Sequence, residues 1–370
     1  MNIEWKIPMN SFKVPRIRFK VFDCVWVENR IADIVKISAG GDVDKVRLKE
    51  SGKYPVIANA LTNKGIVGFY DDYKVKAPAV TVTGRGDVGY AVARHENFTP
   101  IVRLLTLQSD NIDVDYLENL INSMRILNES TGVPQLTAPQ LGNYKVYHSE
   151  IEEQSAIGSL FRTLDDLLAS YKDNLANYQS LKATMLSKMF PKSGQTVPEI
   201  RLDGFEEDWE RKSLSEVCTI NSGRDYKHLK NGDIPVYGTG GYMLSVNEKL
   251  SDEDAIGIGR KGTIDKPYLL SAPFWTVDTL FYVICKVGYD LNYLFLIFQK
   301  IRWKKFDEST GVPSLSKKTI EKVVSKFPSY EEQRAIGLYF SNLDNLINSY
   351  QEKITQLETL KKKLLQDMFI

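Results

Sequence analysis

The sequence has few of the residues that build metal sites and disulfide frameworks. Only 3 cysteines and 3 histidines occur among 370 residues, and their unrelated spacings indicate neither a disulfide framework nor a zinc site. Charged residues interrupt every apolar run well before the roughly 18 residues of a membrane span. The opening stretch MNIEWKIPMNSFKV lacks the apolar core of a signal peptide. These absences favour a cytoplasmic protein without a bound metal.

A strong charge of one sign is also missing, as are the common catalytic motifs. The formal net charge is +1, so no overall basic field indicates a nucleic-acid partner, although a local patch could still supply one. The sequence contains no G-x-S-x-G, no H-E-x-x-H and no Walker A loop. The Asn/Asp-Pro-Pro-aromatic tetrad used by amino-methyltransferases is absent as well. The chain is therefore predicted to bind rather than to catalyse, with no catalytic residue of its own.

What the sequence does contain is a long internal repeat. Ser130–Pro134 (STGVP) matches Ser309–Pro313, and the match continues without insertion for about 60 residues at an offset of 179. A second matched block, PRIRFKVFDCVW from Pro15 and PEIRLDGFEEDW from Pro198, lies at an offset of 183. Between these blocks the similarity nearly vanishes. Two halves with similar frames and different fillings predict a duplication that performs two related tasks on two different targets.

The last part of each half is predicted to form a long helix. Apolar residues recur there in steps of three and four, which is typical of a helix with a narrow apolar stripe close to a coiled-coil seam. About 40 residues at ~1.5 Å each give a rod of roughly 60 Å. Each helix is expected to begin with a capping box, Ser149 with Glu152 in the first half and Ser329 with Glu332 in the second. The apolar positions are Ile157, Leu160, Leu164, Leu167, Tyr171, Leu175, Tyr178, Leu181, Met185 and Met189 in the first helix, and Ile336, Tyr339, Leu343, Leu346, Tyr350, Ile354, Leu357, Leu360, Leu364 and Met368 in the second.

Neither helix can bury this stripe alone, so each is the expected partner of the other. The faces opposite the stripe are strongly polar (SYKDNLANYQS and SYQEKITQLET). This polarity favours a solvated antiparallel coiled coil over the alternative of two core helices inside separate domains. The residues expected at the inter-helix seam, or in contact with a partner, are Leu164, Tyr171, Leu175, Tyr178, Leu343, Tyr350, Ile354 and Leu357.

The fillings are predicted to be mixed α/β domains. β-branched runs such as APAVTVTG and FWTVDTLFYVICK indicate strands between glycine-rich loops, and the stretches VDYLENLINSMRILN and LNYLFLIFQKIRWKKF indicate helices. The predicted fold class is α+β: two mixed α/β domains joined by two long helices that form an antiparallel coiled coil, with an internal pseudo-two-fold repeat. The predicted boundaries are 1–150 for the first domain, 151–192 for the first helix, 193–328 for the second domain and 329–370 for the second helix.

Two glycine-rich stretches, GRGDVG from Gly84 and GIGRKG from Gly257, match the dinucleotide pattern G-x-G-x-x-G. That pattern needs a following helix whose N-terminus holds the pyrophosphate. The residues after Gly89 (YAVARHENF) and after Gly262 (TIDKPYLL) do not open an amphipathic helix. A nucleotide-binding enzyme is therefore the weaker of the alternatives.

Three loops recur in both halves and could bind a ligand. Gly-Arg followed by another glycine occurs at Gly84 and Gly259, where arginine suits a phosphate or a guanine edge, but a hairpin turn with a solvated arginine is an alternative. The loops after Val56 and Val236 carry small, hydroxyl and amide groups, which serve phosphate and base contacts and are also ordinary loop residues. The STGVP segment either holds a phosphate or simply turns the chain toward the helix.

Together these features resemble the specificity subunits of type I restriction–modification systems. The resemblance rests on the frame ESTGVPxLxxxxLxxxxVxxxxxEEQxAIG, the long helix ending in LKxxxLxxMF, the PxIRΦxxFxxxW start of each half and the GR(K)G loops. It covers essentially the whole chain, in the order domain, helix, domain, helix.

The resemblance implies a non-catalytic subunit that reads a bipartite, asymmetric sequence in double-stranded DNA. Each domain would read one half-site, and the paired helices would fix the distance between the half-sites. Half-sites on one face of DNA lie about 34–36 Å apart, which is within the length of such helices. DNA adenine methyltransferase subunits and a restriction endonuclease or translocase subunit are the implied partners, with no membrane involved. S-adenosylmethionine, ATP and magnesium are then expected in those partners and not in this chain.

Carried over to this sequence, the resemblance implies DNA contacts in the recurring loops. Arginine or lysine would read guanine, asparagine would read adenine, and hydroxyls would position phosphates. A coiled-coil scaffold that binds proteins and no DNA is the alternative interpretation. The expected DNA-binding residues are Asn59, Thr62, Asn63, Lys64, Thr83, Arg85, Asp87, Thr239, Tyr242, Arg260, Lys261 and Thr263.

Overall fold

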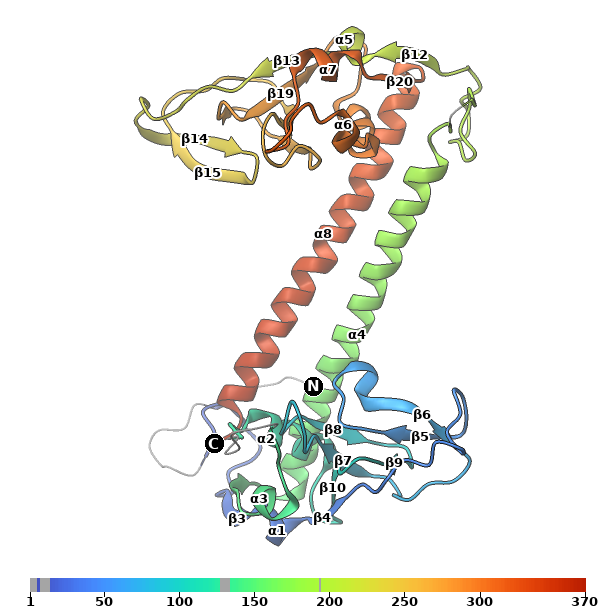
Figure 1. Cartoon of the computed structure of the whole chain (residues 1–370). Helices are drawn as coiled ribbons and strands as arrows, with labels where there is room; N and C mark the ends of the chain where they lie inside the picture. The colour runs from blue at the N-terminus through green and yellow to red at the C-terminus, as the bar shows by residue number, and fades with distance from the viewer. Residues whose placement is uncertain (1–4, 7–13, 127–133, 193) are drawn as a thin grey trace. The chain divides into compact units, whose positions relative to one another are not determined.

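Figure 1 shows a computed structural model of the whole chain, which describes residues 5–6, 14–126, 134–192 and 194–370. The chain divides into two compact units. The first unit comprises Met1–Lys172 with Glu352–Ile370, and the second unit comprises Asp173–Gln351. Both long helices continue from one unit into the other, so each unit contains part of each helix. No helix among the described residues combines the length and the apolar character that a membrane crossing needs.

The first unit contains two main sheets with helices beside them. Its elements are β1 (Trp5–Lys6), β2 (Arg18–Phe19), β3 (Val27–Arg30), α1 (Ile31–Ile34), β4 (Lys36–Ala39), β5 (Tyr54–Ile57), η1 (Thr62–Gly65), β6 (Ile66–Tyr70), β7 (Ala79–Val82), β8 (Ala91–Arg94), β9 (Thr99–Pro100), β10 (Leu105–Gln108), α2 (Val114–Ser123), α3 (Ala138–Gly142), β11 (Lys145–His148) and the start of α4 (Ile151–Lys188). One sheet has the order β4-β10-β7-β8 and the other β6-β5-β9, while β1-β2 and β11-β3 form short pairs.

The second unit repeats this arrangement. Its elements are β12 (Glu210–Ser213), α5 (Leu214–Val217), β13 (Cys218–Ser222), β14 (Asn231–Gly238), β15 (Gly241–Val246), β16 (Ala255–Gly259), β17 (Tyr268–Leu270), β18 (Trp275–Thr276), β19 (Leu280–Cys285), α6 (Leu291–Lys300), η2 (Trp303–Phe306), α7 (Lys317–Lys322), β20 (Val324–Phe327) and the start of α8 (Tyr330–Asp367). The sheets have the orders β13-β19-β16-β17, β15-β14-β18 and β12-β20.

The two units share one topology. In both four-stranded sheets every pairing is antiparallel. In both three-stranded sheets the central strand pairs antiparallel with its hairpin partner and parallel with the third strand. The predicted fold class, two mixed α/β domains with long helices and an internal repeat, is confirmed.

The predicted strands and helices are present, with one difference that matters for function. APAVTVTG contains β7, and the two predicted domain helices are α2 and α6, which end at Ser123 and Lys300, before the ends of the predicted stretches. The run FWTVDTLFYVICK is not continuous, because β18 ends at Thr276 and β19 begins at Leu280. Between them the chain turns, and the Leu280 N–H donates to the Val277 carbonyl at 3.0 Å. This turn belongs to the candidate site.

The two long helices pair antiparallel inside each unit, as predicted. In the first unit the start of α4 packs against the end of α8, and Lys361 Nζ lies 2.5 Å from Asp165 Oδ1. In the second unit the end of α4 packs against the start of α8, and Lys182 Nζ lies 2.5 Å from Asp344 Oδ1. The two lysines, like the two aspartates, stand 179 residues apart, so one contact occurs twice. All four side chains are 20–40% exposed, so each pair contributes at most about 1 kcal/mol.

The buried part of the seam follows the prediction. Leu164, Leu343 and Ile354 are buried, and the rings of Tyr178 and Tyr350 lie 5.3 Å apart. The other predicted seam residues are half-buried: Tyr171, Leu175 and Leu357.

Four leucines assigned to the apolar stripe lie at its exposed edge instead. They are 37–45% exposed: Leu167, Leu181, Leu346 and Leu360. Leu168, directly after Leu167, is buried, and Phe161 and Phe340 are buried one position after the half-buried Leu160 and Tyr339. The prediction is therefore wrong at the four leucines. Near the start of each helix the buried face also includes residues of a domain core, since Phe161 belongs to the core of the first unit and Phe340 to that of the second.

The last residues of each long helix enter the core of a globular domain. Met368 and Phe369, at the end of α8, belong to the core of the first unit, where the Phe369 ring lies 5.4 Å from that of Tyr116. Met189 and Phe190, at the end of α4, belong to the core of the second unit. The repeated Met-Phe pair is therefore an anchor that fastens the end of a helix to the unit in which it finishes.

A buried ion pair explains the second glutamate of the EEQxAIG motif. Glu153 accepts two hydrogen bonds from Arg18, at 2.6 and 2.7 Å, and one from Trp26 Nε1 at 3.1 Å. In the second unit Glu332 accepts from Arg201 at 2.8 and 2.7 Å. Both glutamates are at most 2% exposed. The PxIR and EEQ segments therefore meet in space, and this contact accounts for their joint recurrence.

The glutamine of the motif seats each long helix on a shorter one. Asp113 and Asp290 are the N-caps of α2 and α6. The Asp113 N–H donates to Gln154 Oε1 at 3.1 Å, and the Asp290 N–H donates to Gln333 Oε1 at 3.2 Å. The motif thus fixes where each domain helix starts relative to its long helix.

The predicted capping boxes are only partly present. Ser329 Oγ accepts from the Glu332 N–H at 3.4 Å, but the Glu332 carboxylate binds Arg201 instead of turning back. Ser149 Oγ has no hydrogen-bond partner within the described part of the chain. The box formed by Ser149 and Glu152 is wrong, because α4 begins at residue 151, one position too late for Ser149 to cap it.

Gly337, the glycine of the second AIG motif, leaves no room for a side chain. A Cβ there would lie 2.5 Å from Asp290 Oδ1 and 3.1 Å from the Tyr293 nitrogen, the two atoms that form the N-cap of α6. We expect Gly337→Ala to lower the free energy of unfolding by about 2–4 kcal/mol, because overpacking and a weakened cap act together. Urea denaturation measures this. Gly311→Ala is the control, since nothing lies within 4 Å of its Cβ position; equal losses in both variants would contradict the explanation.

Glu118 of α2 predicts a pH-dependent stability. Burial, and then the nearby Asp165, raise the pKa of Glu118 to about 6. Because this value exceeds that of the unfolded chain, the folded state loses stability as the pH rises through about 6. We expect Glu118→Gln to be about 1–2 kcal/mol more stable than the parent protein at pH 7.5 and equal to it at pH 4.5. Thermal unfolding at the two pH values tests this. A stability difference between the variant and the parent protein that is the same at both pH values would refute it.

Candidate nucleic-acid interface

In the first unit, three loops meet beside the ends of β5, β7 and β9. The Gly84 N–H donates to Asn59 Oδ1 at 2.7 Å, and Asn59 Nδ2 donates to the Val102 carbonyl at 2.6 Å. Asn59 thus joins the loop after β5 to the Gly-Arg loop and to the turn before β10. The Leu136 N–H donates to the Gly84 carbonyl at 2.9 Å, which attaches the segment after STGVP to the same place.

The second unit brings the corresponding loops together. The Val277 N–H donates to the Tyr237 carbonyl at 3.0 Å, so the turn after β18 lies beside the β14–β15 turn. The Arg260 N–H donates to the Thr279 carbonyl at 2.8 Å and adds the second Gly-Arg loop. The Leu315 N–H donates to the Arg260 carbonyl at 2.9 Å. We call each cluster the three-loop site: residues 59–64, 84–87 and 102–103 in the first unit, and residues 239–242, 260–263 and 278–279 in the second.

The hydrogen bonds set a different correspondence between the two Gly-Arg loops than the sequence suggests. The carbonyls of Gly84 and Arg260 accept the same bond, each from a leucine two residues after the STGVP proline. Arg85 therefore corresponds to Lys261, and Arg260 takes the place of a glycine. The alignment of Arg85 with Arg260 is wrong by one residue, because the match of Gly-Arg pairs ignores the partner strand that positions each loop.

The first three-loop site presents basic groups that no described residue neutralises. Lys64, Arg85 and Arg103 are exposed, and their side chains form no ion pair or hydrogen bond with the residues that the structure describes. Asp87 is exposed beside them, on the same loop as Arg85. Thr62 and Asn63 are also exposed on the loop after β5. The site is therefore a place where cations face solvent without compensation.

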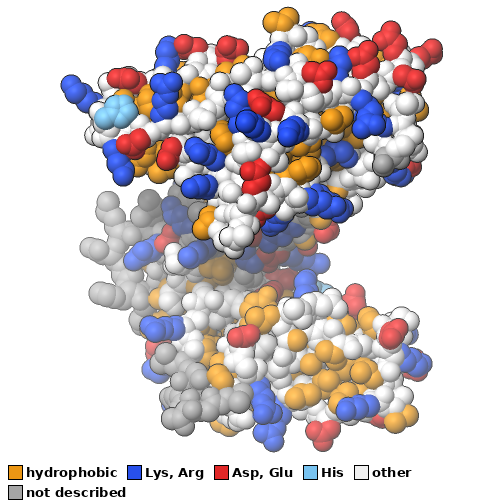
Figure 2. Space-filling view, turned by 45° about the horizontal axis from the view of Figure 1, so that its top comes forward, with side chains coloured by type: hydrophobic (Ala, Val, Ile, Leu, Met, Phe, Trp, Pro, Cys, Tyr) orange, Lys and Arg blue, Asp and Glu red, His pale blue; other side chains and the backbone are white. Residues whose placement is uncertain are grey.

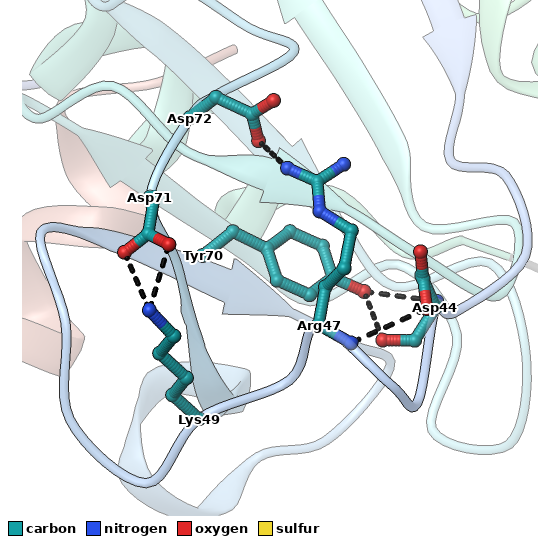
Figure 3. A network of polar contacts seen from close by, with 6 residues as sticks. All are labelled: Asp44, Arg47, Lys49, Tyr70, Asp71 and Asp72. Atoms are coloured by element: carbon teal, nitrogen blue, oxygen red, sulfur yellow. Dashed lines mark hydrogen bonds and ion pairs between the residues drawn. The ribbon is translucent and has the colours of Figure 1, made fainter.

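Two basic side chains of the loop before β5 are paired instead, as Figure 3 shows. Arg47 donates to Asp72 at 2.7 Å, and its guanidinium lies over the Tyr70 ring, 5.4 Å from the centroid. This hydrogen bond lowers the pKa of Asp72. Lys49 forms an ion pair with Asp71 at 2.7 Å. These contacts hold the loop against the end of β6, so its charges serve the fold.

Backbone strain coincides with the first three-loop site. Asn63 and Lys64 both have φ of 49°, while Val102 and Arg103 have φ of 51° and 59°. Within the described chain these are the non-glycine residues with positive φ. Such a conformation is uncommon for lysine and a genuine outlier for a β-branched valine. Strain of this kind persists where the surroundings enforce it, and it clusters at binding sites.

Two of the predicted DNA-binding residues serve the loops themselves. Thr83 is 5% exposed, accepts from the Tyr90 N–H at 2.9 Å and donates to the Asp87 carbonyl. A DNA contact by Thr83 is therefore wrong, because its hydroxyl closes the loop from inside. Asn59 is half-buried and uses both ends of its amide within the unit. A base contact by Asn59 would require these two bonds to break.

In the second unit the predicted residues surround a shallow depression. Thr239, in the turn between β14 and β15, and Tyr242, near the start of β15, line a depression of about 630 Å³. Tyr242 is 63% exposed. Arg260 is exposed, and its guanidinium lies over an aromatic ring of β19, 5.9 Å from the centroid. The remaining predicted residues of this unit are the exposed Lys261 and the half-buried Thr263.

Sequence reasoning missed the third loop of each site. These are the turns that contain Val102-Arg103 and Asp278-Thr279. The second turn lies within FWTVDTLFYVICK, where aromatic and β-branched residues predict an uninterrupted strand. The polar pair Asp278-Thr279 is the signal that could mark the turn. Valine and arginine rarely adopt positive φ, so the sequence could not predict this conformation at Val102 and Arg103.

The STGVP segment acts as a structural loop where it is described. Residues 130–133 of the first copy lie outside the described residues. In the second copy Asp307 accepts from the Ser314 N–H and from Ser309 Oγ, both at 2.9 Å. These bonds, that from Ser314 first, lower the pKa of Asp307. The segment folds back on itself and pairs with the Gly-Arg loop through Lys261 and Ser314.

The chemistry of both sites is that of a recognition surface. Figure 2 shows lysine and arginine side chains interspersed with acidic ones on the face of each unit that is turned to the viewer. Among the described residues, no group of three or more histidine, cysteine, aspartate and glutamate side chains could hold a metal ion. Exposed guanidinium, ammonium, hydroxyl and carboxylate groups on a hydrogen-bonded frame are the groups by which proteins contact phosphates and base edges.

The chain thus consists of two similar α/β domains, each with a polar loop site, and two long helices that pair with each other. The sequence matches the family described as "Type I restriction modification DNA specificity domain" over residues 25–177 and 206–359. The chain belongs to this family.

Known proteins of the same kind are similar along much of the chain. It is 23% identical over 277 residues to the type I restriction enzyme MjaVIII specificity subunit of Methanocaldococcus jannaschii, and the match spans 64% of each chain. It is 21% identical over 354 residues to a putative type I specificity subunit of Mycoplasma pneumoniae, spanning 91% of this chain and 94% of that one. The crystal structure of a type I restriction–modification S subunit from M. genitalium has a TM-score of 0.75 at 18% identity and covers 96% of this chain and 99% of the other. That likeness shows the fold.

The strain at Val102 predicts a stabilising substitution. Asparagine tolerates positive φ far better than valine does, and Val102 is 42% exposed, so little apolar burial is lost. We expect Val102→Asn to raise the free energy of unfolding by about 0.5–1 kcal/mol. Chemical denaturation measures the change. Val46→Asn is the control, because Val46 is 97% exposed without positive φ and should give no gain. A loss of stability in Val102→Asn would disprove the assignment of strain.

Proposed function

We propose that the protein reads a bipartite, asymmetric DNA sequence for a type I restriction–modification complex, with one half-site contacted by each three-loop site. One observation carries this proposal: equivalent backbone positions present different side chains in the two units. The first unit presents Arg85, Val102 and Arg103, where the second presents Lys261, Asp278 and Thr279.

This difference is what reading two unlike half-sites requires. Base pairs are told apart in the major groove by their pattern of donors, acceptors and methyl groups. Two units with the same backbone frame and the same side chains would read the same sequence twice. Because the side chains differ while the frame is common, each unit would contact DNA in the same way and select different bases.

The chemistry of modification and cleavage would belong to partner subunits. We expect DNA adenine methyltransferase subunits, which use S-adenosylmethionine, and an endonuclease or translocase subunit, which uses ATP and magnesium. The paired helices would set the distance between half-sites. The four exposed leucines at the edge of the helix pair (Leu167, Leu181, Leu346 and Leu360) offer apolar surface for such partners.

The low net charge of the chain suggests that its partners contribute part of the affinity for DNA. A formal net charge of +1 is low for a protein that holds DNA alone. Unpaired cations at the three-loop sites would give a moderate affinity that falls steeply with salt, since each phosphate contact releases counterions. The complex with methyltransferase would bind more tightly than the chain by itself.

The decisive experiment is to co-express the chain with an adenine methyltransferase subunit of this kind and to map methylated adenines across a genome. A single asymmetric motif with two specified parts and a fixed gap supports the proposal. Methylation identical with and without this chain would contradict it. Salt-dependent retention of duplex DNA by the complex excludes the alternative of a protein scaffold that binds no DNA, because a scaffold would show none.

Single substitutions should affect one half-site each. We expect Arg85→Ala to weaken discrimination in one half-site and Lys261→Ala in the other, each by about 1–3 kcal/mol if the side chain contacts a base. Binding to duplexes with single base changes measures this for the complex. Arg47→Ala is the matched control, because Arg47 is already paired with Asp72. A loss that is the same for all sequences would assign these residues to phosphates, and no loss would remove them from the site.

A further inference from the structure

The turn that completes each three-loop site has opposite chemistry in the two units. In the first unit the Leu104 N–H donates to the Ile101 carbonyl at 3.1 Å, and in the second the Leu280 N–H donates to the Val277 carbonyl at 3.0 Å. Each bond closes a turn with two residues at its tip. These residues are Val102-Arg103 in the first unit and Asp278-Thr279 in the second. An apolar side chain therefore stands where the other unit has a carboxylate.

Asp278 is a carboxylate without compensation. It is exposed, and it forms no ion pair and no side-chain hydrogen bond with any residue in the described ranges. It lines the depression in which Tyr242 and Met243 are 63% and 48% exposed, together with Lys227. Its neighbour Thr279 is bonded to the Gly-Arg loop through the Thr279 carbonyl. The carboxylate thus belongs to the three-loop site.

An unpaired carboxylate is electrostatically unfavourable on a surface that binds DNA, so its presence there calls for an explanation. It is repelled by the phosphates, and this repulsion lowers affinity for every sequence. The repulsion is offset only where a base donates a hydrogen bond to the carboxylate. In the major groove the donors are the N4 amine of cytosine and the N6 amine of adenine. Asp278 is therefore a candidate for reading one of these two bases.

The shape of the two bases favours cytosine. Adenine places the N7 acceptor beside its N6 amine, so an amide side chain can bond both atoms, whereas the second oxygen of a carboxylate meets the N7 lone pair. Cytosine offers its N4 amine without an adjacent acceptor in the major groove. A carboxylate and cytosine are thus complementary. Val102, at the same position of the first unit, offers only methyl groups and cannot accept this bond.

We propose that Asp278 reads a cytosine in the half-site of the second unit, its carboxylate accepting a hydrogen bond from the cytosine N4 amine. This inference rests on the proposed function and adds the identity of one base to it. Tyr242 and Met243 line the same depression as Asp278. Val102, at the corresponding position of the first unit, cannot make this contact.

The test uses the complex with the methyltransferase subunit and a duplex that carries the mapped motif. The half-site that responds to Lys261→Ala belongs to the second unit. Each C·G pair in it is replaced in turn by T·A, which removes the N4 amine. For one position we expect the parent complex to lose roughly 5- to 150-fold in affinity, and Asp278→Ala to lose this preference. Asp278→Asn keeps the shape, gains a donor and is expected to favour adenine at the same position.

Asp225→Ala is the matched control. Asp225 lines the same depression and carries the same charge, but its Oδ1 accepts from the Lys227 N–H of its own loop at 3.4 Å. Its removal should change affinity equally for all sequences and leave the preference for cytosine intact. Inosine in place of the paired guanine removes only the minor-groove amine. Unchanged binding to the inosine duplex supports a contact in the major groove, and lost binding overturns the contact to N4.

Other outcomes would overturn the proposal without touching the proposed function. If Asp278→Ala strengthens binding to every sequence by the same factor, Asp278 only repels phosphates. If no C·G pair of this half-site responds to Asp278→Ala or Asp278→Asn, the residue reads nothing. In both cases the two-part motif remains. Loss of the motif itself in the parent complex would instead refute the proposed function.

Discussion

The buried ion pair at the start of each long helix is the contact on which the rest of the structure depends. Glu153 receives two hydrogen bonds from Arg18 and a third from Trp26, and Glu332 receives its bonds from Arg201. Removing one partner would leave a charge in a dry interior, at a cost of about 3–5 kcal/mol. The pair joins the beginning of each half to the first turn of the long helix that ends this half. The domain between these two points is thereby fastened to the helix at both ends.

This construction explains why the frames of the two halves are similar and the fillings are not. The frame residues are buried in both units: the glutamate, the glutamine that meets the N-cap of α2 or α6, and the glycine that admits that cap. A change at such a position leaves an unpaired group or a clash. The loops that form the three-loop sites are held by backbone hydrogen bonds and, in the first unit, also by the half-buried side chain of Asn59. Their exposed side chains can therefore differ at little cost in stability.

The two sites show how one frame supports two chemistries. In the first unit the turn at Val102-Arg103 is held with positive φ, beside cations that have no partner. In the second unit the corresponding turn at Asp278-Thr279 has no positive φ and places a carboxylate at the edge of a shallow depression. The same backbone hydrogen bond closes both turns, although their conformations and the side chains that they expose differ. The two units thus differ at these tips while their frame is common.

The repeat, the two long helices, their antiparallel pairing and the mixed α/β class could be predicted from the amino-acid sequence, because they follow from local periodicity and from the comparison of one half with the other. Two of the three loops could be predicted as well, since glycine, arginine and hydroxyl residues gather there. The three-dimensional structure was needed to show that Arg85 corresponds to Lys261, that Thr83 is buried, and that the turns at residues 102 and 278 complete the sites. These facts depend on hydrogen bonds between segments far apart in the chain, and residue type does not indicate which segments become partners.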